Sequence, residues 1–393
     1  MGPSSQRERL INLALSAGSI TMVLALFLAS DWLYSRSQRT DPFASKTLNN
    51  NGVKLYRSDP GTGWYELNPN FEGQDRFGKL IFNVHTDSRG FRDPGSGPGS
   101  GQQAHQTPLS ASAPAVLLLG DSFTYGVGLE WPDTFAAQLA ARYHGPVINA
   151  GVNSHSPTPH LWRLRRWLQQ GSLARDTVIV MAVDISDVFD EATRWRDGPT
   201  TPIDRSTAGQ QKASDSALQT GLPWFRPSTF ILTHQIYFGL EALVKGVIDN
   251  LQVRNNNKSA FTYQHWDQIN TNFAPLGVKG GLKRLGDKIE QAARLSQANG
   301  HRFYLLIYPW PAQLAYANRF SWEQAIGRSC HKPDCSGVIN TFPAFRQEVS
   351  SDRRWQDHLY IRGDMHFQAS GNAIIAAQIL KTLQANQPTQ PAR

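Results

Sequence analysis

Short apolar runs alternate with longer segments of helical periodicity through the middle and the end of this chain. The apolar runs cover 115–119, 146–149, 177–183 and 302–308, and the predicted helices cover 131–143, 158–170, 280–298 and 370–385. Nearly continuous apolar strands that are separated by helices are typical of a parallel sheet with helices on both faces. The pattern therefore predicts an α/β domain over 115–385, with three α/β/α layers and a flavodoxin-like parallel sheet.

Other segments depart from this alternation. Residues 36–93 are rich in Gly, Asn, Asp and aromatic side chains with short apolar runs, which predicts a small β-rich collar. Residues 94–114 are rich in Gly, Ser, Pro and Gln, as in a flexible linker or surface loop, and 386–393 form a tail. An insertion at about 189–277, with an amphipathic helix over 230–251, is expected near the mouth of the site.

The first 35 residues predict a membrane anchor. No charged residue occurs over 10–30, and 21 residues of helix are about long enough to cross a hydrocarbon layer of ~30 Å. Trp32 and Tyr34 follow, where interfacial aromatics are usual. A cleaved signal peptide is the alternative, but the run does not end in a good small-x-small pair. We expect an uncleaved single-pass anchor over 1–35.

The two cysteines bear on the compartment. Cys330 and Cys335 enclose a His, a Lys, a Pro and an Asp, a spacing that suits a local disulfide in an oxidising compartment. A zinc site with His331 as third ligand and a pair of free thiols are the alternatives. Basic residues flank the apolar run on both sides and weaken the charge argument for orientation. The possible disulfide favours a body on the periplasmic side of a bacterial inner membrane.

The charge pattern argues against a nucleic-acid partner. The 393 residues include 39 Lys and Arg and 31 Asp and Glu, a formal net charge of +8. These basic residues are scattered, and no five of them are consecutive, whereas nucleic-acid sites gather Lys and Arg on one face or stripe. A hydrophobic share of 40% predicts a folded protein with a solvated basic surface.

A candidate nucleophile follows the first apolar strand, in the run Gly120-Asp121-Ser122. A serine hydroxyl needs a base and a site for the developing oxyanion, and a strand-to-helix turn aims backbone N–H groups at that oxyanion. The run is not the elbow motif Gly-x-Ser-x-Gly, because Thr124 occupies the last position. Ser122 as an ordinary helix N-cap is the alternative.

A candidate base lies near the other end of the chain. Asp364 precedes His366 by two residues, and such an Asp can fix the imidazole tautomer so that the other nitrogen accepts the serine proton. The alternative is an Asp that caps the last helix beside a surface His. Asp357 and His358 are a competing pair.

Together these motifs resemble the SGNH/GDSL hydrolase family. Gly-Asp-Ser follows the first strand, 149–154 (Asn-Ala-Gly-Val-Asn-Ser) the second and 184–187 (Asp-Ile-Ser-Asp) the third, while Asp-x-His precedes the final helix. The resemblance implies an SGNH hydrolase fold over about 113–385, outside the insertion. It also implies Ser122 as nucleophile and first oxyanion donor, His366 as base and Asp364 as its orienting acid. No cofactor or metal is implied.

The chain departs from the family pattern in three places. Ser154 replaces the glycine whose backbone N–H helps to form the oxyanion hole, and Ser186 replaces the asparagine that donates from its side chain. Asp187 matches the acid that usually follows that asparagine, and we include all three among the expected oxyanion or substrate-binding residues. The single residue between Asp364 and His366 resembles the variant in bacterial polysaccharide acetylation proteins.

These features predict a serine-dependent esterase that acts on acyl, chiefly O-acetyl, esters of cell-envelope glycans. Aromatic residues over 63–70 and 86–93, and Trp310 at the predicted site mouth, could stack on sugars or simply pack the collar. An O-acetyltransferase with the same triad is one alternative, and a non-catalytic glycan-binding scaffold on a hydrolase fold is another. The expected partners are the membrane, an acylated glycan and a membrane-bound acyl-transfer protein.

Overall fold

The computed structural model describes part of the chain. The described residues are 18–19, 21–31, 48–49, 53–58, 65–78, 80–95, 113–195, 273, 275–315 and 321–386. The chain divides into two compact units, Met1–Ser45 with Asp204–Ser259, and Lys46–Ile203 with Ala260–Arg393. The linker, the predicted helix 230–251 and most of the insertion and tail lie outside the described residues.

In the first unit, residues 21–31 are helical. Among the described residues, no helix combines the length and apolar character that crossing a membrane requires. The predicted anchor is only partly covered, because residues 10–17 and Ile20 lie outside the described residues.

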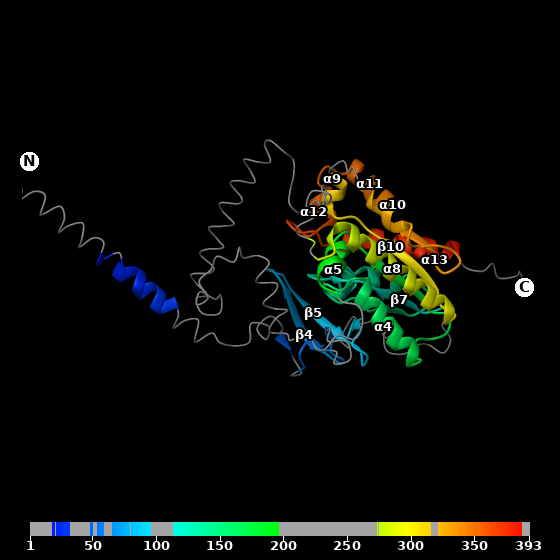
Figure 1. Cartoon of the computed structure of the whole chain (residues 1–393), viewed down its shortest axis with the longest axis horizontal. Coiled ribbons are helices and arrows are strands. Elements are labelled where there is room, and N and C mark those ends of the chain that lie inside the picture. The colour runs from blue at the N-terminus through cyan, green and yellow to red at the C-terminus, as the bar shows by residue number, and fades with distance from the viewer. Residues whose placement is uncertain are drawn as a thin grey trace, which may run out of the picture. The chain divides into compact units, whose positions relative to one another are not determined.

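The described strands of the second unit form one nine-stranded sheet and a separate two-stranded pair (Figure 1). The central strands are β7 (Val116–Leu119), β8 (Val147–Asn149), β9 (Val178–Val183), β10 (Arg302–Ile307) and β11 (Gly337–Asn340). They are parallel in the order β8-β7-β9-β10-β11. The chain therefore reverses its direction of strand addition between β7 and β9, and open α/β sheets bind ligands at such a switch point.

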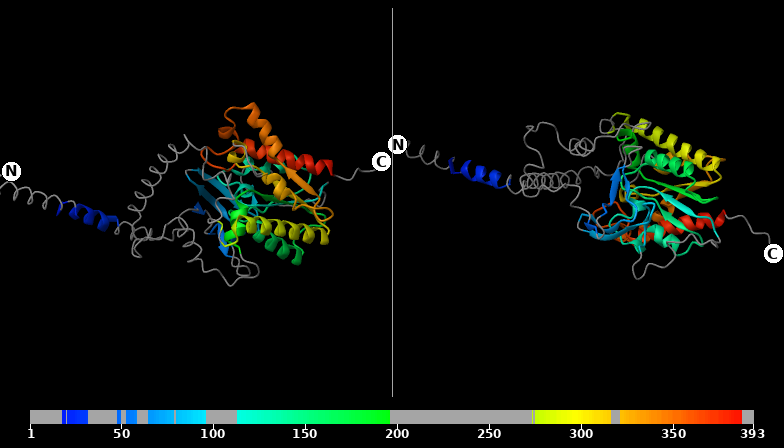
Figure 2. Two further views of the ribbon diagram at one scale, coloured as in Figure 1. Left: turned by 45° about the horizontal axis from the view of Figure 1, so that its top comes forward. Right: turned by 90° about the horizontal axis from the view of Figure 1, so that it is seen from below.

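Helices cover both faces of this parallel half. On one face α8 (Gly277–Ala298) packs on α4 (Pro157–Gln169) and α5 (Asp187–Thr193), and on the other α13 (Ala369–Ala385) packs on α3 (Phe135–Ala140). Figure 2 shows α8 and α13 on opposite sides of the sheet. All six residues of β9 are buried, as expected for a strand covered on both faces. The predicted α/β/α layering is confirmed.

The sheet is mixed rather than purely parallel, which corrects the prediction. The collar adds β6 (Arg92–Asp93), β5 (Leu80–Thr86), β4 (Glu72–Phe77) and β1 (Leu48–Asn49), all antiparallel, beyond β8. The pair β2 (Tyr56–Ser58) and β3 (Tyr65–Leu67) forms the second sheet. The hydrophobic pattern of a strand determines which of its faces is buried, but it does not determine which strand it pairs with.

The helix predicted over 131–143 is interrupted. A 3₁₀ turn, η1 (Trp131–Asp133), precedes α3, and Thr134 between them is extended, with its hydroxyl accepting from the Ala137 N–H. Proline at position 132 starts the turn, and the threonine then caps a new helix. The other helices that the structure describes in this unit are α2 (Ser122–Tyr125), α9 (Pro311–Ala315), α10 (Trp322–Gly327), α11 (Phe342–Ser351) and α12 (Trp355–Leu359). A disulfide joins Cys330 to Cys335 between α10 and β11.

Candidate active site

Ser122 begins α2 directly after β7, at the switch point of the sheet. Asp121 caps this helix, its Oδ1 accepting from the Phe123 N–H at 2.9 Å. Gly120 has no room for a side chain, because a Cβ would lie 1.9 Å from the Thr124 hydroxyl oxygen. The run Gly120-Asp121-Ser122 therefore folds into a tight turn that places the serine at the carboxyl end of a buried strand.

The structure brings Ser122, His366 and Asp364 into one hydrogen-bonded line. Ser122 Oγ lies 2.8 Å from His366 Nε2, and His366 Nδ1 lies 2.5 Å from Asp364 Oδ1. The same oxygen accepts from the His366 backbone N–H at 2.8 Å. With a proton on Nδ1 held by Asp364, Nε2 is the acceptor for the serine proton.

Charge also fits these roles. Burial acts to raise the pKa of Asp364, but its hydrogen bonds and charge interaction with His366 outweigh burial and leave the pKa below its ordinary value. The carboxylate is therefore ionised at neutral pH, as the stabiliser of an imidazolium must be. The competing pair is arranged differently: His358 Nδ1 lies 3.3 Å from Asp352, and the side chains of His358 and Asp357 are both 62% exposed.

Two aromatic rings hold the imidazole of His366. The Phe123 ring, one residue after the serine, lies 4.6 Å from it at an angle of 34°. The Phe77 ring meets it edge-on at 5.0 Å. Phe77 belongs to β4, so the collar reaches the candidate base directly. Sequence periodicity carries no sign of this contact.

Ser154 has a left-handed backbone conformation, which is unusual for a residue other than glycine. Its φ is +58°, in the left-handed region that glycine occupies without strain. Its hydroxyl lies near enough to Tyr65 to affect the pKa of that side chain, and the Tyr65 hydroxyl donates to the Asn153 carbonyl at 2.6 Å. Burial raises the pKa of Tyr65 to about 12. The Ser154 side chain is thus directed to β3 of the collar, which leaves only its backbone for the expected oxyanion role.

Ser186 and Asp187 both contact Asp184 at the end of β9. The Ser186 hydroxyl donates to Asp184 Oδ1 at 2.6 Å, and its backbone N–H donates to the same oxygen at 2.7 Å. Asp187 Oδ2 accepts from the Asp184 N–H at 2.9 Å. A serine has one hydroxyl proton, so in this arrangement Ser186 directs it at Asp184 rather than at an oxyanion.

Three buried carboxyl groups surround the ends of β7 and β9. Burial, reinforced by the neighbouring carboxylates, raises the pKa of Asp121 and Asp187 well above the ordinary value, and burial raises that of Asp184. Trp310 Nε1 donates to Asp184 Oδ2 at 2.8 Å, and the ring is only 7% exposed. Trp310 is therefore a buried partner of Asp184, and its ring is not exposed for stacking on a sugar.

Comparisons with known proteins identify structural neighbours only. No family model and no curated protein matches the chain. Among solved structures, the chain is similar to a lipolytic G-D-S-L family protein from Veillonella parvula (10% identity, TM-score 0.38, 69% of this chain and 99% of that one). It is also similar to TesA, with 15% identity and a TM-score of 0.36 over 69% of this chain and 98% of that one. A third similar structure is the esterase EstA of Pseudoalteromonas sp., with 13% identity and a TM-score of 0.36 over 70% of this chain and 98% of that one.

The fold assignment rests on the strand order of the chain and on where its motifs lie. Ser122 follows the switch-point strand β7, and Asp364 and His366 precede the last helix α13. These positions agree with the α/β fold that the resemblance to the SGNH/GDSL hydrolases predicts. Within this domain, the parallel half carries all three residues of the hydrogen-bonded line.

Sequence reasoning missed the residue that ties the collar to the nucleophile turn. Arg92 is 1% exposed, and its Nη1 donates to the carbonyls of Tyr125 at 2.6 Å and Gly126 at 2.8 Å. Its Nη2 donates to the Leu129 carbonyl at 2.6 Å. Its guanidinium lies 4.9 Å from the centre of the Tyr125 ring, whose hydroxyl donates to Asp75 on β4 at 3.0 Å. Arg92 thus fixes the exit of α2, three residues after the serine.

The motif over 149–154 also holds α2 in place. Asn149 Nδ2 donates to the Thr124 carbonyl at 2.8 Å, and its Oδ1 accepts from the Gly151 N–H at 3.0 Å. A Cβ on Gly151 would lie 2.2 Å from the Tyr125 nitrogen, so only glycine allows this approach. These residues position α2.

Within the described residues, no group of three or more His, Cys, Asp or Glu side chains is placed to hold a metal ion. The three buried carboxyl groups at the strand ends are accounted for by protein hydrogen bonds, as given above.

Proposed function

We propose that the chain is a serine esterase that works through an acyl-enzyme. The observation that carries this is the line of hydrogen bonds from Ser122 through His366 to Asp364 at the carboxyl end of β7. His366 accepts the serine proton as Oγ attacks the ester carbonyl, and then gives that proton to the leaving alcohol. Water, activated by the same imidazole, hydrolyses the acyl-serine.

The oxyanion would be held mainly by backbone groups. The N–H of Ser122 at the start of α2 is the first donor that we propose, and the backbone N–H of Ser154 is the second. The Ser186 hydroxyl is directed at Asp184, and the loss of one side-chain donor can slow acyl transfer by about 10²–10³-fold. We therefore expect a slow esterase toward simple esters.

The substrates that we propose are O-acyl, chiefly O-acetyl, esters of cell-envelope glycans on the periplasmic side of a bacterial inner membrane. Support comes from the charge-free run 10–30, from the exposed apolar side chains of Met22, Val23 and Leu24 in the described helix, and from the disulfide. Transfer of the acyl group to a sugar hydroxyl, with a membrane-bound acyl donor as partner, would use the same acyl-enzyme.

The deciding experiment combines turnover with covalent labelling. The full chain in non-ionic detergent is assayed with p-nitrophenyl acetate and with a fluorophosphonate probe, beside Ser122→Ala, His366→Ala and the matched control His358→Ala. We expect labelling and hydrolysis to disappear in the first two variants and to persist in the control. A folded wild type that neither reacts with the probe nor exceeds Ser122→Ala in rate would overturn the proposal in favour of a non-catalytic scaffold.

Membrane attachment has its own test. We expect the full chain, produced in bacterial cells, to stay with the membrane fraction after an alkaline carbonate wash, and a chain that lacks residues 1–35 to leave it. Recovery of the full chain in the wash would contradict the anchor.

A further inference from the structure

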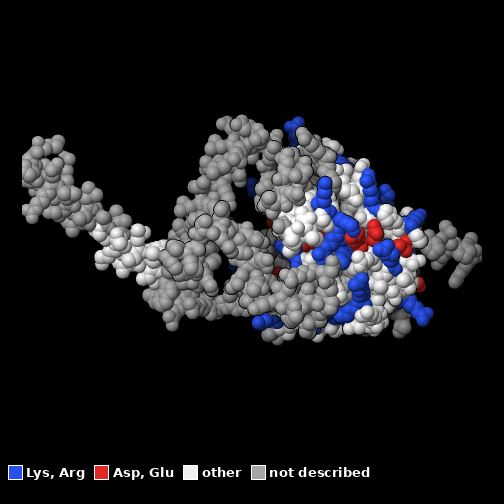
Figure 3. Space-filling view, in the orientation of Figure 1, with Lys and Arg blue, Asp and Glu red and all other residues white. Residues whose placement is uncertain are grey.

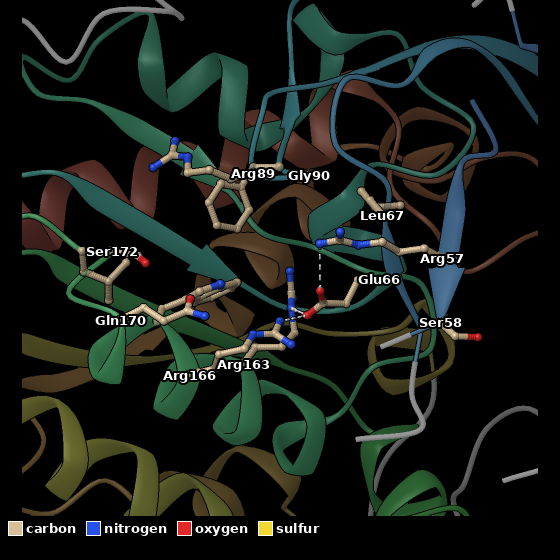
Figure 4. Close-up of a pocket in the computed structure, with 13 residues that line it drawn as sticks. Arg57, Ser58, Glu66, Leu67, Arg89, Gly90, Arg163, Arg166, Gln170 and Ser172 are labelled. Carbon is tan, nitrogen blue, oxygen red and sulfur yellow. Dashed lines mark hydrogen bonds and ion pairs between the residues drawn. The ribbon is translucent and has the colours of Figure 1, made fainter. Parts of the chain in front are cut away.

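A cavity of ≈ 380 Å³ lies between the collar and α4, and none of Ser122, Asp364 and His366 lines it. Its volume is in the range of small-molecule sites. The described residues that line it are Arg57, Ser58, Glu66, Leu67, Arg89, Gly90, Phe91, Arg163, Arg166, Trp167, Gln170, Ser172 and Leu173. Figure 4 shows Arg57 and Glu66 from the collar turned toward Arg163 and Arg166 from α4, while the Arg89 side chain extends away from this group.

The described lining is strongly basic. It holds four arginines and one glutamate, Glu66, whose side chain is 10% exposed. Glu66 contacts Arg57 at 3.6 Å, Arg163 at 3.4 Å and Arg166 at hydrogen-bond distance. One carboxylate thus serves three guanidinium groups, and the positive charge of the described lining exceeds its negative charge.

The arginines are held in place as a built site requires. Arg163 is buried, its Nη1 donates to the Ala150 carbonyl at 2.6 Å, and its guanidinium lies 4.7 Å from the centre of the Trp167 ring. Arg89 is tied to Asp87 by two hydrogen bonds of 2.8 and 3.0 Å. The side chains of Arg57 and Arg89 are 45% and 47% exposed, so the cavity meets solvent on that side. A guanidinium offers paired donors that match a carboxylate or a phosphate.

The rest of the lining suits a ring with hydroxyl groups. Ser58, Gln170 and Ser172 supply neutral donors and acceptors, while Phe91 and Trp167 supply an apolar wall. Figure 3 shows Lys and Arg spread over the visible face of the described residues, with Asp and Glu among them. A basic surface alone therefore does not distinguish this cavity. Its distinction is a fixed cluster of guanidinium groups around a space that can hold a sugar.

We propose that this cavity binds an anionic sugar, through the carboxylate or phosphate that the sugar bears. The geometry that carries the proposal is the joint placement of Arg57 and Arg89 from the collar with Arg163 and Arg166 from α4. The proposal does not depend on the esterase activity, because binding requires no turnover.

The test measures binding to the full-length Ser122→Ala chain in non-ionic detergent by titration calorimetry. The probes are trigalacturonate, its neutral counterpart maltotriose, glucose 6-phosphate and inorganic phosphate. We expect one or both anionic sugars to bind, and the tighter of the two to identify the charged group. Binding should weaken when salt is raised from about 0.1 M to about 1 M, as the screening length falls from ~10 to ~3 Å.

Three variants locate the site. Arg57→Ala removes a partly exposed charge, and Gln170→Glu adds a negative charge to an exposed rim residue without loss of packing. Each should raise Kd about tenfold. The matched control Arg353→Ala removes the same charge from an exposed residue between α11 and α12 and should leave Kd unchanged.

Four outcomes would overturn the proposal. If maltotriose binds as tightly as trigalacturonate, the charge of the ligand does not contribute to binding. If inorganic phosphate binds as tightly as glucose 6-phosphate, the sugar does not contribute. An equal loss of affinity in Arg353→Ala would show that binding depends only on the net charge of the protein. Wild-type affinity in both Arg57→Ala and Gln170→Glu, with circular dichroism showing folded protein, would place binding elsewhere.

Discussion

The parallel half of the sheet and its antiparallel extension contribute differently to the candidate active site. The parallel half, with the turns that follow its strands, supplies Ser122, Asp364 and His366. The collar supplies none of these three but reaches them through Arg92 and Phe77. The comparison shows that the three residues with reactive groups come from one part of the sheet, whereas residues from both parts hold them in place. Substitutions of the reactive residues should therefore mainly lower activity, whereas substitutions in the collar should mainly lower stability.

The largest expected effect comes from the parallel half. Asp364→Asn should lower kcat for p-nitrophenyl acetate by about 10³–10⁴-fold, because an amide no longer holds the imidazole in the required tautomer. Asp357→Asn is the control, since its side chain is 62% exposed, and its rate should stay at the wild-type value. A similar loss of kcat in both variants would show that Asp364 has no special role in catalysis.

The strongest test of the collar is Arg92→Met. The substitution removes the hydrogen bonds from Arg92 to four backbone carbonyls, those of Asn83, Tyr125, Gly126 and Leu129, so the free energy of unfolding in urea should fall by about 3 kcal/mol or more. Arg89→Met, three residues earlier and 47% exposed, should cost about 1 kcal/mol or less. If the two variants unfold at the same urea concentration, Arg92 does not hold the nucleophile turn as described.

The buried carboxyl groups of the parallel half make stability depend on pH. The pKa of Asp187 is raised by burial and by Asp184 and Asp121, so the folded chain favours its protonated form. Its contribution to stability is full below the ordinary Asp value of about 4 and is lost as pH rises toward the folded pKa. From about pH 4 to about pH 8, the free energy of unfolding of wild type should therefore fall by more than that of Asp187→Asn.

A control separates this effect from a general dependence on pH. Asp176→Asn changes an exposed residue and should follow the wild-type curve. Parallel urea-unfolding curves for wild type and Asp187→Asn across this pH range would show that Asp187 does not take part.

The smallest expected effect is at the contact between the two halves. Phe77→Ala removes the edge-on ring contact with His366 and should lower kcat about 2- to 10-fold with KM unchanged. Ile81→Ala, in the same hairpin and 48% exposed, is the matched control. A fall in KM or an equal loss in the control would mean that the ring does not act through the imidazole.

The sequence by itself predicted the features that are local along the chain. Four apolar runs predicted β7 to β10, because a strand that is covered on both faces must be apolar throughout. β11 was not predicted, since only Val338 and Ile339 of its four residues are apolar and they form no such run. The turns with Ser122 and with Asp364 and His366 were also predicted from sequence, because short motifs at strand and helix ends carry their own chemistry.

Only the tertiary structure decided which groups meet across long separations. Three of the four carbonyls that Arg92 binds lie 33 to 37 residues away, and a backbone carbonyl is present at a position whatever its side chain. The direction of the Ser186 hydroxyl and the burial of Trp310 both depend on Asp184, which the motif alone does not reveal. The arginine cavity likewise joins a collar hairpin to α4. Periodicity records which face of an element is buried, whereas the partner on that face is fixed by packing in three dimensions.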